Sequence, residues 1–256
     1  MNPTLFISDL HLCPSRPAVN TRFLRFLSDE APQAEALYIL GDLFEYWIGD
    51  DDRANGLNAE VVNALRALSD KGTRVFFMHG NRDFLIGGEF AEVAGLTLLP
   101  DPTVLELHGQ RVLLMHGDTL CTDDTDYQRF RVMVRDPAWQ SAFLARPLAD
   151  RRTEVEGMRR RSEASKREKP MAIMDVSTRA VEEVLRIFAY PPFLIHGHTH
   201  RPARHAISVD GRACTRLVLP DWHEQSQPHR LALSSDLIRA EDPPEYPQRS
   251  PTPPRP

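Results

Sequence analysis

Acidic, histidine and asparagine residues follow short apolar segments at five places in the chain. The five motifs are Asp-x-His, Gly-Asp-x-x-Glu, Gly-Asn-Arg-Asp, His-Gly-Asp and Gly-His-x-His. Their candidate metal ligands are Asp9, His11, Asp42, Asn81, His116, His198 and His200. Carboxylate, imidazole and amide oxygen together suit divalent ions such as Mn²⁺, Fe²⁺ or Zn²⁺, and no thiolate motif of a structural zinc site accompanies them. The pattern predicts a divalent metal centre.

Each motif alone has an ordinary structural explanation. Gly-Asp after an apolar strand is commonly a turn, and an isolated His-x-His occurs by chance. Five motifs in this order, each at a predicted strand end, favour a dinuclear centre instead. An aspartate can bridge two ions about 3.5–4 Å apart, which then share a hydroxide and stabilise both ends of an in-line displacement at phosphorus. We therefore expect a two-metal hydrolase that cleaves phosphoesters.

Short strands must position these residues. Apolar runs of strand length end where the five motifs begin; they are Thr4–Ser8, Ala36–Leu40, Arg74–His79, Arg111–Met115 and Phe193–Ile195. Helical periodicity covers Asn20–Asp29 and Asn58–Asp70, and Gly72 follows the second segment as a stop signal. The alternation of strand and helix predicts a layered α/β fold, in which the strand ends bring their polar residues to one edge.

Two pairs of segments are typical of β-hairpins. The pairs are Thr103–Leu107 with Arg111–Met115, and Ala206–Val209 with Ala213–Leu219. Asp210 and Gly211 supply the turn of the second pair. We expect that hairpin, together with Leu231–Leu233, to complete the sheet with antiparallel strands.

Residues 120–175 differ from the rest of the chain and hold no clear strand. Large apolar residues are interleaved there with arginines; they are Phe130, Trp139, Phe143, Leu144 and Leu148. Pro137 and Pro147 bound a short helix, and a basic, helix-prone stretch follows. We interpret 120–175 as a helical cap inserted into a core of residues 1–119 and 176–240. The Pro-rich tail, 241–256, is expected to be disordered.

Composition excludes several classes of protein. The chain has 256 residues, of which 41% are hydrophobic, so a sizeable core is possible. A net charge of −5 gives no global attraction to nucleic acid. Three cysteines, Cys13, Cys121 and Cys214, argue against a disulfide framework and for reduced thiols in the cytosol. The N-terminus lacks the basic region of a signal peptide, and no apolar run reaches the about 20 residues that span a bilayer.

The five motifs resemble those of the calcineurin-like metallophosphoesterase superfamily over roughly residues 4–120 and 190–220. The resemblance implies a β-sandwich flanked by helices. It also implies a first metal site formed by Asp9, His11, Asp42 and His200. The second site would be formed by Asp42, Asn81, His116 and His198, with Asp42 as the bridge. Members of the superfamily commonly have histidine after Gly-Asn, where this sequence has Arg82. This difference reduces the number of subgroups within the superfamily that the sequence can resemble.

Five longer segments resemble the corresponding segments of a subgroup of enzymes in bacterial lipid A synthesis. The segments are ILGDLFEYWIGDDD, MHGNRDFLIG, LMHGDTLCTDD, AIMDV and IHGHTHRP. Members of this subgroup hydrolyse UDP-2,3-diacylglucosamine to UMP and 2,3-diacylglucosamine 1-phosphate, by attack at the phosphorus next to uridine. The resemblance implies catalytic roles for Asn81, Arg82 and His198. It implies substrate contacts by Asn81, Arg82, Asp124, Ser162, Lys166, Lys169 and His198. We expect two divalent ions, with Mn²⁺ as the metal.

The cap has two interpretations. Trp139 and Phe143 stand four residues apart and would share one helix face, which either binds acyl chains or packs on the core. The basic residues of 151–169 either hold the sugar phosphate or form a solvated face. Tyr127 either contacts the ligand or only packs. Basic side chains near the cap would also favour an anionic membrane surface.

The resemblance implies a lipid-linked nucleotide sugar as the partner and a place on the cytoplasmic face of the inner membrane. Together with the composition, it predicts a peripheral cytoplasmic monomer that binds no nucleic acid. We interpret Glu45 and Asp83 as carboxylates that orient ligands or arginines, and His196 as structural. One alternative is a metallophosphoesterase that acts on a soluble nucleotide or a phosphoprotein. Another is a non-catalytic binding scaffold, which the complete set of seven candidate ligands disfavours.

Overall fold

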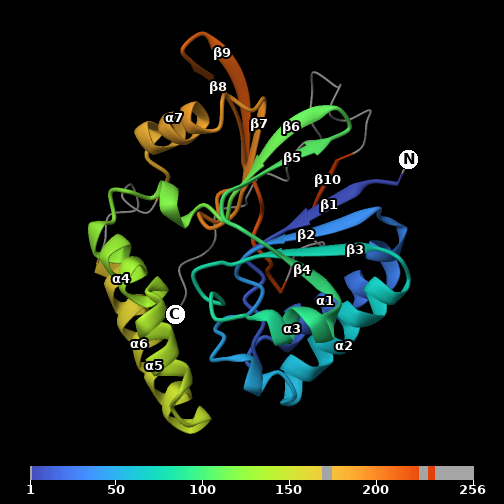
Figure 1. Ribbon diagram of the computed structural model, residues 1–256, viewed down its shortest axis with the longest axis vertical. Helices are drawn as coiled ribbons and strands as arrows, with labels where there is room; N and C mark the ends of the chain where they lie inside the picture. Colours follow the sequence, from blue (N-terminus) through green and yellow to red (C-terminus); the bar gives the residue numbers. More distant parts are fainter. Residues whose placement is uncertain (1, 169–174, 225–229, 234–256) are drawn as a thin grey trace.

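The computed structural model describes residues 2–168, 175–224 and 230–233; of residues 161–168 it describes the backbone only. Within these residues, two five-stranded sheets form the centre of the molecule (Figure 1). The first sheet contains, in order, β10 (Leu231–Leu233), β1 (Thr4–Ile7), β2 (Ala36–Leu40), β3 (Arg74–Met78) and β4 (Leu96–Leu99). The second contains, in order, β5 (Thr103–Leu107), β6 (Gln110–Leu114), β7 (Phe193–His196), β9 (Arg212–Val218) and β8 (Ala203–Val209).

Helices cover the outer face of each sheet. The first sheet packs on α1 (Pro17–Arg25), which continues as a π-helix over Phe26–Glu30, and on α2 (Gly56–Asp70) and α3 (Gly88–Ala94). The second sheet packs on α7 (Thr178–Ile187). The central strands are buried on both faces, which explains why their sequences are continuous apolar runs rather than alternating ones.

The two sheets face each other through an apolar core. On the first sheet, Phe6, Tyr38 and Phe76 are in register on three neighbouring strands. Their rings stack with centroid distances of 5.1 and 4.6 Å. Such aromatic pairs contribute about 0.5–1.5 kcal/mol beyond the burial of their area, so this ladder stabilises one inner face of the sandwich.

The predicted β-sandwich flanked by helices is confirmed, and both predicted hairpins form, as β5–β6 and β8–β9. The expectation that Leu231–Leu233 completes the same sheet as the second hairpin is wrong. This strand pairs antiparallel with β1 in the first sheet, because the chain crosses from one sheet to the other after β9. The helix predicted from Asn20 begins earlier, at Pro17, since proline suits the first turn of a helix. Sequence reasoning did not identify α3, β4 or α7.

Three further helices occupy the chain between β6 and β7: α4 (Thr125–Arg135), α5 (Pro137–Leu144) and α6 (Leu148–Glu168). Figure 1 shows them bundled together, apart from the helices that cover the first sheet. Asp124 caps α4 by accepting from the backbone N–H of Tyr127 at 3.1 Å. Asp136 caps α5 by accepting from Ala138 and Trp139. These N-caps separate α4 and α5 into distinct helices.

The apolar face of α5 packs on the core. Phe143 is 3% exposed and belongs to the same cluster as the helix-covered face of the first sheet. Its ring stacks on Trp139 with a centroid distance of 5.0 Å, and Trp139 contacts Phe84. For these two side chains the structure supports packing on the core rather than an open acyl-binding face.

A buried arginine fastens α6 to the core. Arg151 is 2% exposed and donates to the backbone carbonyl of Ile48 and to both carboxylate oxygens of Asp51, 100 residues away in the chain. The next arginine, Arg152, donates to Oδ1 of Asp52 at 3.0 Å. These ion pairs hold α6 against the loop that follows β2.

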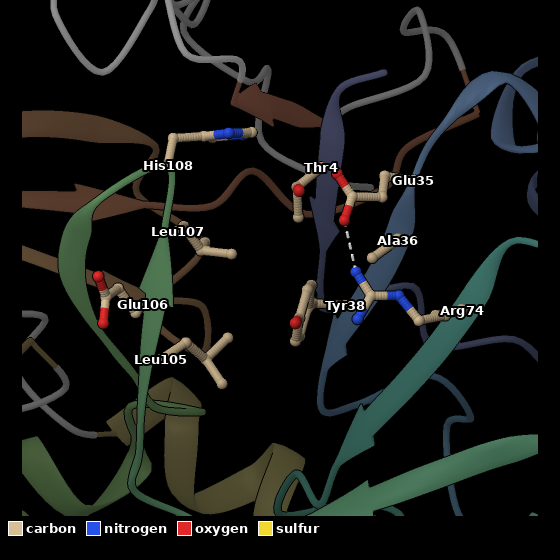
Figure 2. A pocket seen from close by; sticks show the side chains of 9 residues that line it. All are labelled: Thr4, Glu35, Ala36, Tyr38, Arg74, Leu105, Glu106, Leu107 and His108. Atoms are coloured by element: carbon tan, nitrogen blue, oxygen red, sulfur yellow. Dashed lines mark hydrogen bonds and ion pairs between the residues drawn. The ribbon is translucent and has the colours of Figure 1, made fainter. Parts of the chain in front are cut away.

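A cavity of about 180 Å³ opens between β5 and the N-terminal ends of β1, β2 and β3 (Figure 2). Its lining residues are Thr4, Glu35, Ala36, Tyr38, Arg74, Leu105, Glu106, Leu107 and His108. Figure 2 shows the ion pair of Glu35 with Arg74 (2.6 Å) on one side and the β5 side chains Leu105 and Leu107 on the other. The lining residues Thr4, Ala36 and Arg74 lie at the N-terminal ends of β1, β2 and β3. The cavity is therefore at the opposite end of these strands from the motifs, which follow their C-terminal ends.

We predict that Asp51→Ala destabilises the fold more than Arg151→Met. The carboxylate side chain of Asp51 is 55% exposed, and its loss leaves a buried guanidinium without an anion. A buried charge that loses its partner costs about 3–5 kcal/mol, whereas Arg151→Met removes the charge and keeps an apolar side chain. Urea denaturation followed by circular dichroism gives both free energies of unfolding. A larger loss in Arg151→Met would contradict the role assigned to this ion pair.

Candidate metal centre

The seven side chains predicted as ligands follow strand ends of both sheets and lie together. They are Asp9 and His11 after β1, Asp42 after β2, Asn81 after β3, His116 after β6, and His198 and His200 after β7. The backbone N–H of His198 donates to Oδ2 of Asp9 at 2.9 Å, which joins the second sheet to the first. Parallel strands place their carboxyl ends at one edge, and here the edges of two sheets meet.

Four of these residues form a first ligand group: Asp9, His11, Asp42 and His200. Nε2 of His11 lies 3.3 Å from Nε2 of His200 and 3.8 Å from Oδ2 of Asp42. Nε2 of His200 lies 3.4 Å from Oδ1 of Asp9. Two imidazole nitrogens and two carboxylate oxygens therefore converge on one point.

A second ligand group consists of Asp42, Asn81, His116 and His198. Oδ1 of Asn81 lies 3.0 Å from Nε2 of His116 and 2.9 Å from Nδ1 of His198. Nε2 of His116 lies 3.8 Å from Oδ1 of Asp42. Asp42 thus turns one oxygen toward each group, as an aspartate that bridges two ions would. Asp9 also approaches this group, because ligand atoms of Asp9, Asp42 and His116 all lie within 4.8 Å of one another.

The charge of the two groups suits divalent cations. Oδ1 of Asp9 is buried and has no hydrogen-bond partner, which is costly for a carboxylate unless a cation faces it. Burial alone would lower the pKa of His200, but the carboxylates of Asp221 and Asp9 raise it to about 10. For His116, Asp42 and Asp118 outweigh burial and raise the pKa to about 9. A bound cation would neutralise the negative potential that raises both pKa values.

The backbone holds most of the candidate ligands in the left-handed region. The positive φ angles are 56° at Asp9, 52° at His11, 55° at Asp42, 67° at His198 and 55° at His200. Non-glycine residues adopt this region at an energetic cost and cluster there at functional sites. The sharp change of direction turns each side chain away from its strand and toward the shared point.

Two glycines allow the motif loops to approach the carboxylates closely. A Cβ atom at Gly80 would lie 2.1 Å from Oδ1 of Asp42, and one at Gly197 would lie 2.3 Å from Oδ2 of Asp9. Real Cβ atoms do not come this close to a neighbour, so each motif needs glycine at that position for steric reasons.

Asp83, the last residue of Gly-Asn-Arg-Asp, holds the loop of Asp42. Its buried carboxylate accepts from the backbone N–H groups of Gly80 at 2.9 Å and Leu43 at 2.7 Å, and from that of Asp42 at 3.2 Å. Burial, and then the nearby charge of Asp42, raises the pKa of Asp83 to about 7. Asp83 therefore orients the loop of a candidate ligand, as predicted.

Glu45 and Asp221 stand behind the histidines of the first ligand group. Oε2 of Glu45 lies 3.3 Å from Nδ1 of His11. Oδ2 of Asp221 lies 3.1 Å from Nδ1 of His200. The sequence analysis interpreted Glu45 as a carboxylate that orients ligands or arginines, without naming His11 as its partner. It missed Asp221, which follows β9 outside every motif.

Arg82 lies beside the first ligand group, and at least one N–H donor of its guanidinium has no acceptor among the described residues. Its Nη1 is 3.7 Å from Oε1 of Glu45, and its buried Nε has no hydrogen-bond partner. The backbone N–H of Arg82 donates to Oδ1 of Asp42 at 2.9 Å. The side chain is thus held next to the centre, where its guanidinium can meet phosphate oxygens.

Helix α4 presents a polar stripe to the second ligand group. The hydroxyl of Tyr127 and Nε of Arg131 donate to Oδ2 of buried Asp118, at 2.5 and 2.7 Å. Four residues further along, Arg135 donates to the carbonyl of Gly80 at 2.8 Å. The ring of Tyr127 also lies 6.0 Å from that of His198. Sequence reasoning missed both arginines, although the successive spacings of four from Tyr127 to Arg131 and from Arg131 to Arg135 place all three on one helix face.

The predicted substrate contacts outside the motif loops lie on the inserted helices or beyond them. Asp124 is the N-cap of α4. Ser162 and Lys166 lie on α6, where only the backbone is described, and Lys169 lies outside the described residues. His196 is fully buried: its Nδ1 lies 2.9 Å from the carbonyl of Gly197 and its Nε2 lies 3.0 Å from Nη1 of Arg216. Both ring nitrogens of His196 thus have partners within the fold, which agrees with the structural role expected of this residue.

We predict that Asp42→Ala loses both metal ions, whereas His11→Ala mainly weakens one. Asp42 faces both ligand groups and His11 faces only the first. Metal content after dialysis against Mn²⁺, measured by elemental analysis, gives the stoichiometry of each variant. Circular dichroism serves as the folding control. Two retained ions in folded Asp42→Ala would exclude the bridging role.

Comparison with known proteins agrees with this geometry. The sequence model of the calcineurin-like phosphoesterases matches residues 3–202. The UDP-2,3-diacylglucosamine hydrolase of Aromatoleum aromaticum is 58% identical, over 87% of this chain and 90% of its own. Proteins with the same name from Stenotrophomonas maltophilia K279a and Escherichia coli O81 are each 52% identical, over 89% and 87% of this chain and 94% and 92% of theirs. The resemblance seen in the five motifs is confirmed: the chain belongs to the calcineurin-like phosphoesterase family of metal-dependent hydrolases.

Proposed function

We propose that this chain hydrolyses the pyrophosphate bond of UDP-2,3-diacylglucosamine in lipid A biosynthesis, giving UMP and 2,3-diacylglucosamine 1-phosphate. The observation that carries the proposal is the identity of 58% to a relative of that name over nearly the whole chain. The convergence of seven oxygen and nitrogen ligands from both sheets supports it, because a pyrophosphate brings negative charge that such a centre would bind.

The seven ligand side chains would hold two divalent ions, which we propose to be Mn²⁺. When bound, these ions would supply positive charge to the phosphoryl oxygens and lower the pKa of a water molecule. Asn81 and His198, which face each other at 2.9 Å, would in addition border the substrate phosphate. The leaving group is itself a phosphate, so the reaction needs no strong general acid.

Arg82 would bind the pyrophosphate as a planar donor. Its guanidinium lies at the edge of the first ligand group, with a side chain that is 14% exposed. A partly dry site strengthens such contacts, because water competes less for the phosphate oxygens. We therefore assign Arg82 to the stabilisation of charge that develops at phosphorus.

We propose that α4–α6 form a cap for the lipid part of the substrate. Since Trp139 and Phe143 pack on the core, the acyl chains need other apolar surface. Phe130 and Leu144 are 36% and 39% exposed and are candidates for it. The remaining proposed contacts to the substrate are those of Asp124, Ser162, Lys166 and Lys169.

The location proposed for the protein is the cytoplasmic face of the inner membrane, where it would act as a peripheral monomer. Among the described residues, no helix is both long and apolar enough to cross a bilayer. Helix α4 exposes Val132 and Met133, at 72% and 47%, near Arg129, which also pairs with the exposed carboxylate of Asp126 at 3.2 Å. Apolar and basic side chains together favour an anionic lipid surface.

We predict that the Mn²⁺-loaded protein hydrolyses UDP-2,3-diacylglucosamine in ¹⁸O-water and places the label in UMP. The expected attack is at the phosphorus next to uridine. Mass spectrometry of both products locates the label, and EDTA should abolish turnover. UDP-sugars without acyl chains are the matched comparison, and a faster reaction with these would favour a soluble nucleotide as the substrate. Label in the lipid phosphate would refute the assigned point of attack.

We predict that Arg82→Ala lowers turnover by on the order of 10²-fold or more, as expected for the loss of a donor that stabilises developing charge. Arg82→Lys should restore only part of the activity, because an ammonium group cannot make a planar two-point contact. Metal content should remain at the wild-type value in both variants. Loss of metal in either variant would instead mean that Arg82 supports the site.

A further inference from the structure

In the first ligand group, each histidine has a carboxylate close to Nδ1, the ring nitrogen that does not face the proposed metal position. Nδ1 of His11 lies 3.3 Å from Glu45, and Nδ1 of His200 lies 3.1 Å from Asp221. In each case the other nitrogen, Nε2, points to the shared ligand position. Both carboxylates are well buried, with side chains that are 12% and 7% exposed.

The second ligand group differs on this point. Nδ1 of His116 lies 2.8 Å from the backbone carbonyl oxygen of Leu40, a neutral acceptor. The group also contains Asn81, whose amide oxygen carries no charge, in the place that Asp9 takes in the first group. His116 therefore has a neutral supporting acceptor, and the group includes one neutral ligand.

We propose that Glu45 and Asp221 are positioning residues that make the first ligand group the tighter metal site, the one that fills first. The inference rests on the dinuclear centre of the proposed function. A carboxylate beside Nδ1 keeps the proton on that nitrogen, so that the lone pair of Nε2 faces the metal. It also increases the basicity of the imidazole as a ligand.

The charged ligands favour the same order. The first group contains the carboxylates of Asp9 and Asp42, and Oδ1 of Asp9 lies 3.4 Å from Nε2 of His200. The second contains the carboxylate of Asp42 and the neutral amide of Asn81, and Asp9 approaches it from the first group. A divalent cation is attracted more strongly to two carboxylates than to one at similar distances, and more so in a site with little water. Ligand charge and histidine support therefore act in the same direction.

Two other carboxylates near the centre do not reverse this order. Asp118 lies on the side of the second group, but Arg131 at 2.7 Å and the hydroxyl of Tyr127 at 2.5 Å engage it. Asp83 lies behind the loop of Asp42, which the two groups share, and accepts from backbone N–H groups. Arg131 thus offsets the charge of Asp118, and the charge of Asp83 acts on a ligand that both groups share.

Glu45 and Asp221 should not contribute equally. Oε1 of Glu45 lies 2.9 Å from Nε of Arg159 on α6 and 3.7 Å from Nη1 of Arg82. Two guanidinium groups thus share its charge. Asp221 also contacts Nε2 of His223, at 2.8 Å, whose side chain is half exposed. We therefore expect the larger effect from Asp221.

The first test asks which ligand group is the tighter one. Mn²⁺ is titrated into the metal-free full-length chain by calorimetry, with electron paramagnetic resonance to distinguish single ions from coupled pairs. We expect a tight event followed by a weaker one. His116→Ala should keep the tight event, and His200→Ala should lose it. The opposite pattern would overturn the proposal.

The second test asks what sets the difference. Asp221→Asn should weaken the tight event about 10- to 100-fold and Glu45→Gln by less, as expected when the partner of a ligating histidine is removed. Asp118→Asn is the matched control, because it neutralises a carboxylate beside the second group, and it should leave the tight event unchanged. Circular dichroism of the metal-free variants checks folding.

A merely structural role would weaken both binding events or unfold the metal-free protein, and either result in both variants would overturn the inference. Failure of the proposed function looks different. A chain that binds Mn²⁺ in this order but leaves UDP-2,3-diacylglucosamine intact would contradict the function alone. A chain that hydrolyses this substrate while both variants keep wild-type affinity would contradict the inference alone.

Discussion

The negative charge in the interior is the constraint on which the rest of this structure depends. Asp9, Asp42, Asp83 and Asp118 are each at most 2% exposed, and a buried carboxylate is tolerated only with cations or N–H groups around it. Asp83 accepts from backbone N–H groups at both oxygens, and Asp118 accepts from Tyr127 and Arg131 at Oδ2. Asp9 and Asp42 each accept a backbone N–H, from His198 and Arg82, and they also face histidines where divalent ions would bind. The left-handed turns, the close glycines and the placement of α4 all serve this arrangement.

Much of the site could be predicted because its signals are local. Each motif directly follows an apolar run, and parallel strands bring their carboxyl ends together, so the grouping of residues as far apart as Asp9 and His200 follows from the pattern. Residues that act across long sequence separations gave no such signal. Asp221 lies outside every motif, and Arg151 meets Asp51 across 100 residues of chain. Only the folded backbone determines which of many similar charges meet.

The inserted helices show how an amphipathic pattern can be misread. Trp139 and Phe143 share a face, as their spacing requires, but the pattern does not say what covers that face. Phe84 and the adjoining core lie within reach, and burial there gains about 1.5–3 kcal/mol for each large side chain. Other apolar side chains stay exposed, among them Val132 and Met133 on α4 and Leu144 at the end of α5. Arginines also attach α4 and α6 to the core, through the hydrogen bonds of Arg135 to Gly80 and of Arg151 to Ile48.

The wide spacing of the ligands along the chain has a consequence for folding. His11 and His200 meet although 189 residues separate them, so the unfolded chain has no preformed site and closing so long a loop is entropically unfavourable. Metal ions would therefore bind the native state almost exclusively. By mass action each site would then stabilise the fold, by about 2.7 kcal/mol at a free metal concentration one hundred times its dissociation constant. The cellular supply of the ion would thus influence how long the protein survives as well as how fast it works.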